Sequence, residues 1–255
     1  MKNKIVYYGM AAFFLVSAAL FQVISPHPSW GGESQGKKLE GGPQAVKAEP
    51  VVRRVQEWYD KLTDLQADFR QKSFSQTLNT TTEARGKIYF KKPNLMKWDY
   101  ESPEKQIYVI NQKDFWWYVP EDAQVVKRKA STVLQDTTPL SFLSGLGNLQ
   151  QSFIISLADG GSQPDDSGVV LLNLVPRRAQ ANIKKMQLKL EARELGITGI
   201  ILVDPYGNTN DIDFLHLQRN QGLADTIFHF VPPRGVEVID EDVPDTGKPV
   251  SPVTH

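Results

Sequence analysis

Histidine and the carboxylates are the side chains of this sequence that could hold a metal ion or move a proton. The 255-residue chain has four histidines and no cysteine, which excludes a thiol nucleophile, a thiolate metal site and a disulfide. His27 and His255 lie near the chain ends, and His216 and His229 stand singly in alternating segments. No histidine has a carboxylate at the spacing of a metal site. We therefore predict that these histidines face solvent.

The acidic residues offer two further candidates. Asp204, Asp211 and Asp213 cluster around a turn, but the regular spacing of a calcium loop is missing, which favours a solvated turn. Glu191 and Glu194 indicate a charged loop. The sequence also has no Gly-x-Ser-x-Gly elbow, phosphate-binding loop or dinucleotide fingerprint. These observations predict a protein that is not an enzyme and that needs neither a cofactor nor a metal.

The start of the chain predicts export. Lys2 and Lys4 precede an apolar run over residues 5–24, which is the layout of a signal sequence. The run approaches the roughly 20 residues that span a bilayer. Two alternatives stay open: a cleaved signal peptide over 1–25, or an uncleaved inner-membrane anchor. A Gly- and Pro-rich flexible linker over 26–49, a folded domain over 50–240 and a disordered, acidic tail over 241–255 are expected to follow.

The densest pattern in the folded part is aromatic and lies between residues 86 and 117. Three alternating runs, separated by turn signals at 92–94 and 101–103, predict antiparallel strands. The aromatic residues are Tyr89, Phe90, Trp98, Tyr100, Tyr108, Phe115, Trp116 and Trp117. Strands of this kind form a core or an apolar concave surface. Because both faces of 106–119 are apolar, the pattern leaves open which of Trp116 and Trp117 faces inward.

Nucleic acid is a poor partner for these strands. Aromatic residues interleaved with lysines can stack on single-stranded bases. However, the chain has 29 basic and 29 acidic residues, and nucleic-acid binding is usually accompanied by a basic excess. Together with the export signal, this balance predicts that the chain does not bind nucleic acid.

The remaining elements are mostly strands. Apolar spacing predicts a helix over 51–65 that begins after Pro50, and Thr138-Pro139 begins a short helix that ends near Gly145. Alternating segments continue to the last predicted strands, 210–217 and 226–230. Two helices cannot cover a broad sheet. We therefore expect a mainly β fold of about ten strands, and a sheet that curls around itself with the two helices across its mouth would leave an apolar hollow.

Two stretches resemble the periplasmic outer-membrane lipoprotein carrier family, LolA. The first is Phe90-Lys-Lys-Pro-Asn-Leu-Met-Lys-Trp-Asp-Tyr100, followed by Pro103 and an aromatic run over 115–118. The second is Asp-x-x-Gly-Asn at 204–208, followed by Phe-x-Phe-x-x-Pro-x-Gly-Val at 228–236. The resemblance extends in order over about 50–240, and it implies a half-open antiparallel β-barrel of about ten strands with a lid of short helices over an apolar cavity.

The resemblance implies a function without covalent chemistry. A carrier of this family takes lipoproteins from an inner-membrane ABC transporter, shields their acyl chains in the periplasm and delivers them to an outer-membrane receptor. We expect such a carrier to be a monomer. A second hypothesis keeps the fold but assigns a membrane-tethered lipid-binding or envelope-sensing module, which retention of the run at 5–24 would favour. A third, an enzyme acting on a lipid or glycan, lacks a candidate acid–base pair.

The strand pattern and the resemblance together predict the site. The expected cavity residues are Val55, Tyr59, Leu62, Phe69, Ile88, Phe90, Met96, Trp98, Tyr108 and Trp117. The expected lid residues are Leu140, Phe142 and Leu143, with Lys92 as a latch. In the family an arginine typically stands before this proline and holds the lid closed. A lysine cannot make the fork of hydrogen bonds that a guanidinium makes, so we expect a looser latch or a lid held in another way.

Overall fold

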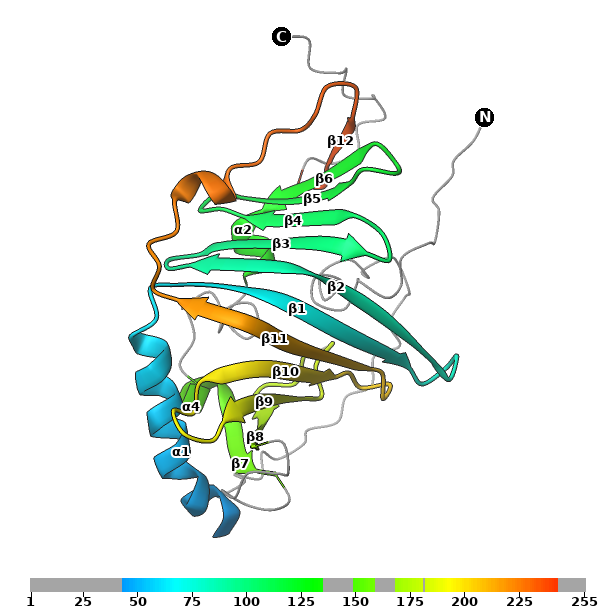
Figure 1. Ribbon diagram of the computed structural model, residues 1–255. Coiled ribbons are helices and arrows are strands. Elements are labelled where there is room, and N and C mark those ends of the chain that lie inside the picture. Colours follow the sequence, from blue (N-terminus) through cyan, green and yellow to red (C-terminus); the bar gives the residue numbers. More distant parts are fainter. Residues whose placement is uncertain (1–42, 135–148, 159–167, 181, 243–255) are drawn as a thin grey trace.

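The computed structural model describes residues 43–134, 149–158, 168–180 and 182–242, which form a 12-stranded sheet (Figure 1). The strand order across it is β12-β6-β5-β4-β3-β2-β1-β11-β10-β9-β8-β7. The elements are α1 (Pro43–Asp60), β1 (Asp64–Ser75), β2 (Thr80–Lys91), β3 (Leu95–Ser102), β4 (Gln106–Ile110), β5 (Asp114–Val119), β6 (Gln124–Lys129), α2 (Ala130–Val133), α4 (Leu149–Ser152), β7 (Phe153–Leu157), β8 (Val169–Pro176), β9 (Lys185–Glu191), β10 (Ile197–Val203), β11 (Thr209–Arg219), the 3₁₀ helix η3 (Asp225–Phe228) and β12 (Glu237–Asp240).

The sheet is open, because its two edge strands, β12 and β7, do not pair with each other. Neighbouring strands are antiparallel except for β12, which runs parallel to β6. The β1–β2 hairpin at the centre is the longest pair, and β11 joins its other side (Figure 1). This arrangement confirms the predicted mainly β class and its few helices. The lid segment expected at 138–147 lies outside the described residues.

Helix α1 differs from its predicted bounds. It begins at Pro43, inside the predicted linker, and ends at Asp60 rather than near residue 65. Pro50 lies within it, where the missing N–H removes one helical hydrogen bond. The apolar stripe of the predicted helix is nevertheless the buried face, because Val51, Val52, Val55 and Tyr59 join the core, while charged residues such as Arg53 and Glu57 face solvent. Packing of this stripe, mainly on β7, compensates for the interrupted hydrogen bonding.

Gly86 allows two strands and an aromatic ring to meet closely at the centre of the sheet. The pairing of β2 with β3 shifts register between Arg85 and Gly86, as in a β-bulge. A Cβ at position 86 would overlap the carbonyl oxygen of Asp99 and lie 2.9 Å from Cε1 of Phe69. The absence of a side chain here therefore lets the Phe69 ring pack directly against the backbone of the curved sheet.

The segment after β11 was predicted incorrectly. Residues expected to form a strand at 226–230 instead form η3 and an extended arm that leads to β12 (Figure 1). Phe228 is the anchor, because it is buried with Leu95 and Leu223 in a small cluster separate from the main core. Pro232 and Pro233 follow, and neither has an N–H to donate to a strand ladder. The alternating apolar residues at 226–230 therefore anchor the arm locally and do not pair in the sheet.

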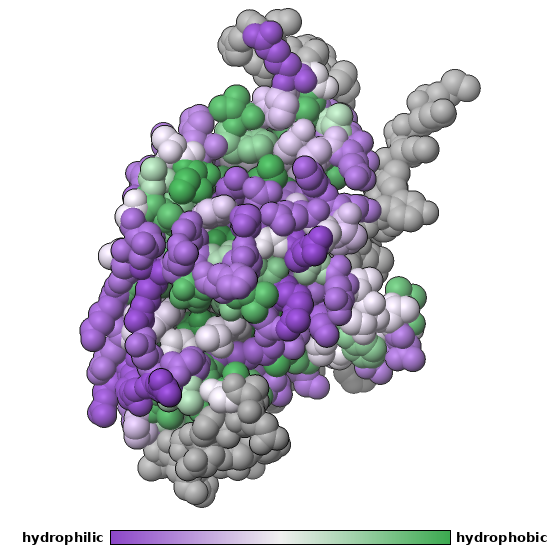
Figure 2. Space-filling view, in the orientation of Figure 1, coloured by the Kyte–Doolittle hydropathy of each residue, from purple (hydrophilic) through white to green (hydrophobic). Residues whose placement is uncertain are grey.

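The outer face of the sheet is largely polar. Figure 2, in the same orientation as Figure 1, shows hydrophilic residues over much of this side and hydrophobic residues in small patches. Ion pairs cross neighbouring strands there, such as Arg70–Asp213 at 3.0 Å and Lys189–Asp213 at 2.7 Å. Among the described residues, no His, Asp and Glu side chains gather as a metal site. No helix within these ranges is both long and apolar enough to cross a membrane, and the run at 5–24 falls outside them.

Candidate apolar binding pocket

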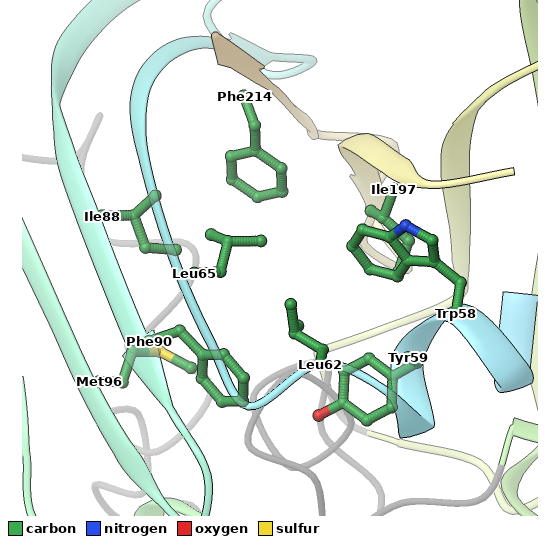
Figure 3. Close-up of a pocket in the computed structure, with 9 residues that line it drawn as sticks. All are labelled: Trp58, Tyr59, Leu62, Leu65, Ile88, Phe90, Met96, Ile197 and Phe214. Carbon is green, nitrogen blue, oxygen red and sulfur yellow. The ribbon is translucent and has the colours of Figure 1, made fainter. Parts of the chain in front are cut away.

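A pocket lies where helix α1, the start of β1 and the inner faces of β2, β3, β10 and β11 meet (Figure 3). It encloses about 390 Å³ of empty space when its opening to solvent is included. The nine lining residues are all apolar or aromatic, and they are Trp58, Tyr59, Leu62, Leu65, Ile88, Phe90, Met96, Ile197 and Phe214. A lining of this kind suits hydrocarbon rather than a charged ligand.

Strand alternation places one wall of the pocket. Every second residue of β2 and β3 faces inward, so Ile88, Phe90 and Met96 share the inner face, and Phe90 pairs with Met96 across the two strands. Leu65 of β1 pairs with Phe90 on the other side. The indole N–H of Trp98 donates to Sδ of Met96 at 3.2 Å. The wall therefore combines fixed aliphatic groups with a flexible thioether, which adapts to irregular shapes.

Helix α1 and the segment after it form the opposite wall. Figure 3 shows Trp58 and Tyr59 projecting from the helix: the ring of Trp58 lies beside Ile197, and that of Tyr59 points toward Phe90, with Leu62 between Tyr59 and the strand residues. Leu62 is buried just before β1 begins. The pocket thus depends on how the end of α1 sits against the sheet.

Lys92 fixes that end of α1. Its Nζ donates a hydrogen bond of 2.5 Å to the backbone oxygen of Tyr59 and lies 4.1 Å from the centre of the Tyr59 ring. The backbone N–H of Lys92 also donates to the oxygen of Thr63 at 2.9 Å. Burial lowers the pKa of Lys92, and the nearby carboxylate of Asp60 opposes that shift. The predicted latch residue therefore contacts α1, while the predicted lid residues Leu140, Phe142 and Leu143 lie outside the described residues.

A row of aromatic rings continues from the pocket along the inner face. The rings of Phe69 and Trp98 are 4.9 Å apart, and those of Phe69 and Tyr100 are 4.8 Å apart. Tyr108 lies 5.6 Å from Tyr100 and stacks on Trp117 at 5.8 Å with an angle of 7°. Edge-to-face and offset contacts of this kind are favourable between aromatic rings. The row is a continuous line of buried ring contacts that extends from beside the pocket to β5.

The two tryptophans of β5 are now distinguished. Trp117 packs against the inner core and donates its indole N–H to Oε1 of Gln106 at 3.2 Å. Trp116 faces the other side, with its ring 5.7 Å from that of Phe230 in the C-terminal arm. The sequence could not separate them because the arm also presents an apolar surface, which makes both faces of β5 apolar.

The tyrosines near the pocket stay uncharged at neutral pH. Burial raises the pKa of Tyr59, and the charge of Asp60 adds to this shift. Burial also raises the pKa of Tyr100 and, together with Tyr100 itself, that of Tyr108. An ordinary tyrosine stays neutral up to a pH well above 7, and these shifts extend that range. The phenols therefore act as hydrogen-bonding groups and not as bases.

The structure brings together part of the predicted site. Tyr59, Leu62, Ile88, Phe90 and Met96 line the pocket. The other predicted cavity residues are Val55, Phe69, Trp98 and Tyr108, which are buried in the main core, and Trp117, which packs at its edge. Binding by any of them stays a prediction.

Four lining residues were not predicted as site residues: Trp58, Leu65, Ile197 and Phe214. Trp58 and Leu65 were already within the apolar helical pattern, so their position could have been expected at the mouth. Ile197 and Phe214 come from the second half of the chain, in strands of ordinary alternation. Only the order of strands in the sheet brings them to the pocket, and no local signal carries that information.

Comparison with known proteins agrees with this geometry. The family model for the outer membrane lipoprotein carrier protein LolA matches residues 60–231. An outer-membrane lipoprotein carrier protein of Methylococcus capsulatus is 28% identical over 221 residues, which cover 87% of this chain and 97% of the relative. One from Bordetella pertussis is 31% identical over 171 residues, covering 67% of this chain and 77% of the relative.

A solved structure shares the fold. An uncharacterized conserved protein from Thermus thermophilus superposes with a TM-score of 0.50 at 15% identity, and the match covers 76% of this chain and 99% of that one. Likeness at this identity concerns the fold alone. The family match over most of the folded part, with relatives that the chain covers for most of their length, establishes membership: the chain belongs to the LolA family of outer membrane lipoprotein carrier proteins.

Proposed function

We propose that this protein is a periplasmic carrier that shields the acyl chains of lipoproteins between the two membranes. The observation that carries the proposal is the wholly apolar lining of the pocket between α1 and the inner face of the open sheet. Family membership and the names of the relatives support the same role.

The energetics of an acyl chain explain the need for such a pocket. A buried methylene is worth about 0.8 kcal/mol, so a chain of roughly 15 methylenes costs about 12 kcal/mol to expose to water. A carrier must cover most of that surface. It must also release the chain. If the pocket walls pack against each other in the empty protein, a ligand must displace that contact, which weakens net binding without making the pocket smaller. In this scheme the wall that moves is the end of α1 with Tyr59, and Lys92 holds that wall in place.

The proposed role involves binding and release and no bond cleavage. Tyr59 is the only titratable side chain among the nine lining residues, and burial raises its pKa. A buried phenol that is held neutral is suited to packing against a ligand rather than to proton transfer.

The proposed partners follow from the same role. The cargo is an acylated lipoprotein, the donor an inner-membrane ABC transporter and the acceptor an outer-membrane receptor. The carrier acts as a monomer in the periplasm.

A charge placed in the pocket tests the proposal. Met96 is 1% exposed, and Met96→Glu should reduce affinity for N-phenylnaphthylamine, an apolar fluorescent probe, at least about tenfold, because a carboxylate is costly to desolvate. Leu78→Glu makes the same chemical change at an exposed position and should leave affinity unchanged. Circular dichroism checks that both variants fold, and Met96→Gln provides a milder variant. Equal affinity of folded Met96→Glu and the parent protein would contradict the proposal.

A membrane-tethered module of the same fold is the second candidate. The observation that favours it is the length of the apolar run at 5–24, which is close to a bilayer span. N-terminal sequencing of the exported protein decides between them. A mature chain that starts beyond residue 25 supports the diffusing carrier, and one that retains the run supports the tethered module.

A further inference from the structure

A directed chain of hydrogen bonds crosses the inner face beyond the aromatic row. The hydroxyl of Tyr100 donates to Oε1 of Gln71 at 2.8 Å, and Nε2 of Gln71 donates to Oγ of Ser73 at 3.0 Å. The hydroxyl of Ser73 then donates to Oδ1 of Asn210 at 3.3 Å. All four side chains are buried, and they link β3, β1 and β11. Each donation points the same way, toward Asn210.

The chain ends on a donor. Nδ2 of Asn210 is buried, and no acceptor among the described residues lies within hydrogen-bond distance of it. Asn210 is 0% exposed, so bulk water does not reach the amide. Buried polar groups are nearly always paired, because an unpaired one loses its hydration without compensation. Since Oδ1 already accepts from Ser73, the missing partner is a hydrogen-bond acceptor.

The donor lies on the ligand-facing side of the sheet. Asn210 shares the inner face of β11 with Ile212 and Phe214, and Phe214 lines the apolar pocket. Phe214 lies four residue steps along the strand from Asn210, a span of about 13 Å at the usual rise. Phe69 and Tyr100 of the aromatic row lie beside this path, because Phe69 pairs with Phe214 across β1 and β11 and Tyr100 bonds to Gln71.

The chemistry of the unpaired donor favours an ester carbonyl as its partner. An ester oxygen accepts a hydrogen bond and brings no donor of its own, whereas an amide brings an N–H that would need a second partner. The four polar side chains carry no positive charge, so a buried carboxylate would be uncompensated. A water molecule would need two to four polar partners to replace bulk hydration. An ester joined to a long hydrocarbon matches both the donor and the apolar path next to it.

We propose that Nδ2 of Asn210 binds the ester carbonyl of an O-acylated ligand whose hydrocarbon runs along the aromatic row toward the pocket. This assignment rests on the proposed carrier function and adds a polar subsite to it. The subsite distinguishes an acyl ester from a plain hydrocarbon of the same length. It also fixes the direction in which the chain lies on the sheet.

Two matched probes test the subsite. One is a pyrene-labelled long-chain fatty acid methyl ester, and the other is its ether analogue, in which CH₂ replaces the carbonyl. The parent protein should bind the ester about five- to tenfold more tightly than the ether, the difference expected for one neutral hydrogen bond to a buried donor. Equal affinities for the two probes would overturn the subsite while leaving the carrier function intact. If neither probe bound, the carrier function would fail and the subsite with it.

A variant locates the preference. Asn210→Leu removes the unpaired donor at similar volume but also removes the acceptor of the Ser73 hydroxyl. The melting temperature should therefore fall slightly or stay the same, the ether affinity should stay the same, and the ester preference should vanish. Thr209→Val is the control, because it removes a polar group one residue away on the opposite face and should keep the preference. An ester preference that persists in Asn210→Leu would overturn the assignment. Should Asn210→Leu fail to fold, the comparison of ester and ether in the parent protein still decides.

Discussion

The sheet has an aromatic half and an aliphatic half, which meet at β1 and β11. The inner faces of β2–β5 carry stacked rings, among them Trp98, Tyr108 and Trp117. The inner faces of β8–β10 carry leucine, isoleucine and methionine, and Leu172, Leu188 and Leu190 are 0% exposed. Helix α1 packs on the aliphatic half (Figure 1). The pocket lies where the two halves meet (Figure 3).

The difference assigns separate tasks to one sheet. Branched aliphatic side chains interlock at high density, and losing even one methylene from such a core is destabilising. Aromatic rings are flat and rigid, and they offer a large apolar area against which a hydrocarbon chain can pack in more than one position. We therefore infer that the aliphatic half supplies most of the folding stability and that the pocket and aromatic row supply the binding surface.

The largest expected effect comes from the aliphatic half. Leu188→Ala should lower the free energy of unfolding by about 2–5 kcal/mol, because Leu188 is fully buried between strands. Affinity for the apolar probe should change little. Urea denaturation measures the first quantity and fluorescence titration the second. Val175→Ala, at a position 41% exposed, is the control and should alter neither. A large loss of probe affinity in folded Leu188→Ala would contradict the inference that stability and binding come from different halves of the sheet.

A smaller effect is expected at the junction. Lys92→Met removes the hydrogen bond to the Tyr59 oxygen and the contact with its ring, which should lower stability by about 1–2 kcal/mol. With α1 held less firmly, the probe should associate faster in stopped-flow measurements. Lys105→Met replaces an exposed lysine and should change neither quantity. An unchanged association rate would show that α1 does not control access.

A still smaller effect belongs to the outer face. Lys189 bonds to both Asp211 and Asp213, which lie on the same face of β11. Lys189→Met leaves these two carboxylates side by side, with Arg70 still paired to Asp213, and should cost about 1 kcal/mol at low ionic strength. Burial would raise the pKa of Asp213, but hydrogen bonds from Lys189 and Arg70 lower it overall. The stability from Asp213 is therefore present above the ordinary aspartate pKa and is lost as the pH falls through the lowered value.

Urea denaturation of this variant at two salt concentrations and two pH values provides the measurement. The difference from the parent protein should shrink in high salt and at acid pH, and probe affinity should not change. A difference that is independent of salt would instead mean that Lys189 acts through packing of its hydrocarbon stem.

The smallest effect is a titration. Because burial lowers the pKa of Lys92, the folded protein releases this proton more readily than the unfolded chain does. Stability linked to Lys92 should therefore rise as the pH increases from the lowered pKa to the ordinary lysine value of 10.5. In NMR titrations, one lysine side-chain resonance should move at lower pH than the others and be absent in Lys92→Met. If all lysines titrate together, Lys92 is not held against α1 in solution.

Local pattern was sufficient to predict most strands and one wall of the pocket. Alternation in 86–100 placed Ile88, Phe90 and Met96 on one face, and the structure has them there. Helical spacing likewise identified Val55 and Tyr59 as the buried stripe of α1. These successes share a cause, since each pattern is written in consecutive residues that pack on one surface.

Features that depend on distant parts of the chain could not be predicted in this way. Ile197 and Phe214 reach the pocket only through the strand order, and Trp116 is distinguished from Trp117 only by the C-terminal arm. The strand expected at 226–230 does not form, because Phe228 anchors the arm in a separate cluster. Pro50 was expected to mark the start of the helix. The helix instead starts at Pro43 and contains Pro50, because tertiary packing outweighs local preference.

The central claim is that the pocket binds acyl chains, and it is tested most directly with one lipoprotein in two forms. Isothermal titration in detergent-free buffer would compare binding of the acylated lipoprotein with that of the same protein lacking its acylated cysteine. We predict binding of the acylated form only, with a negative heat-capacity change from burial of apolar surface. Equal binding of both forms, or binding of neither, would contradict the claim.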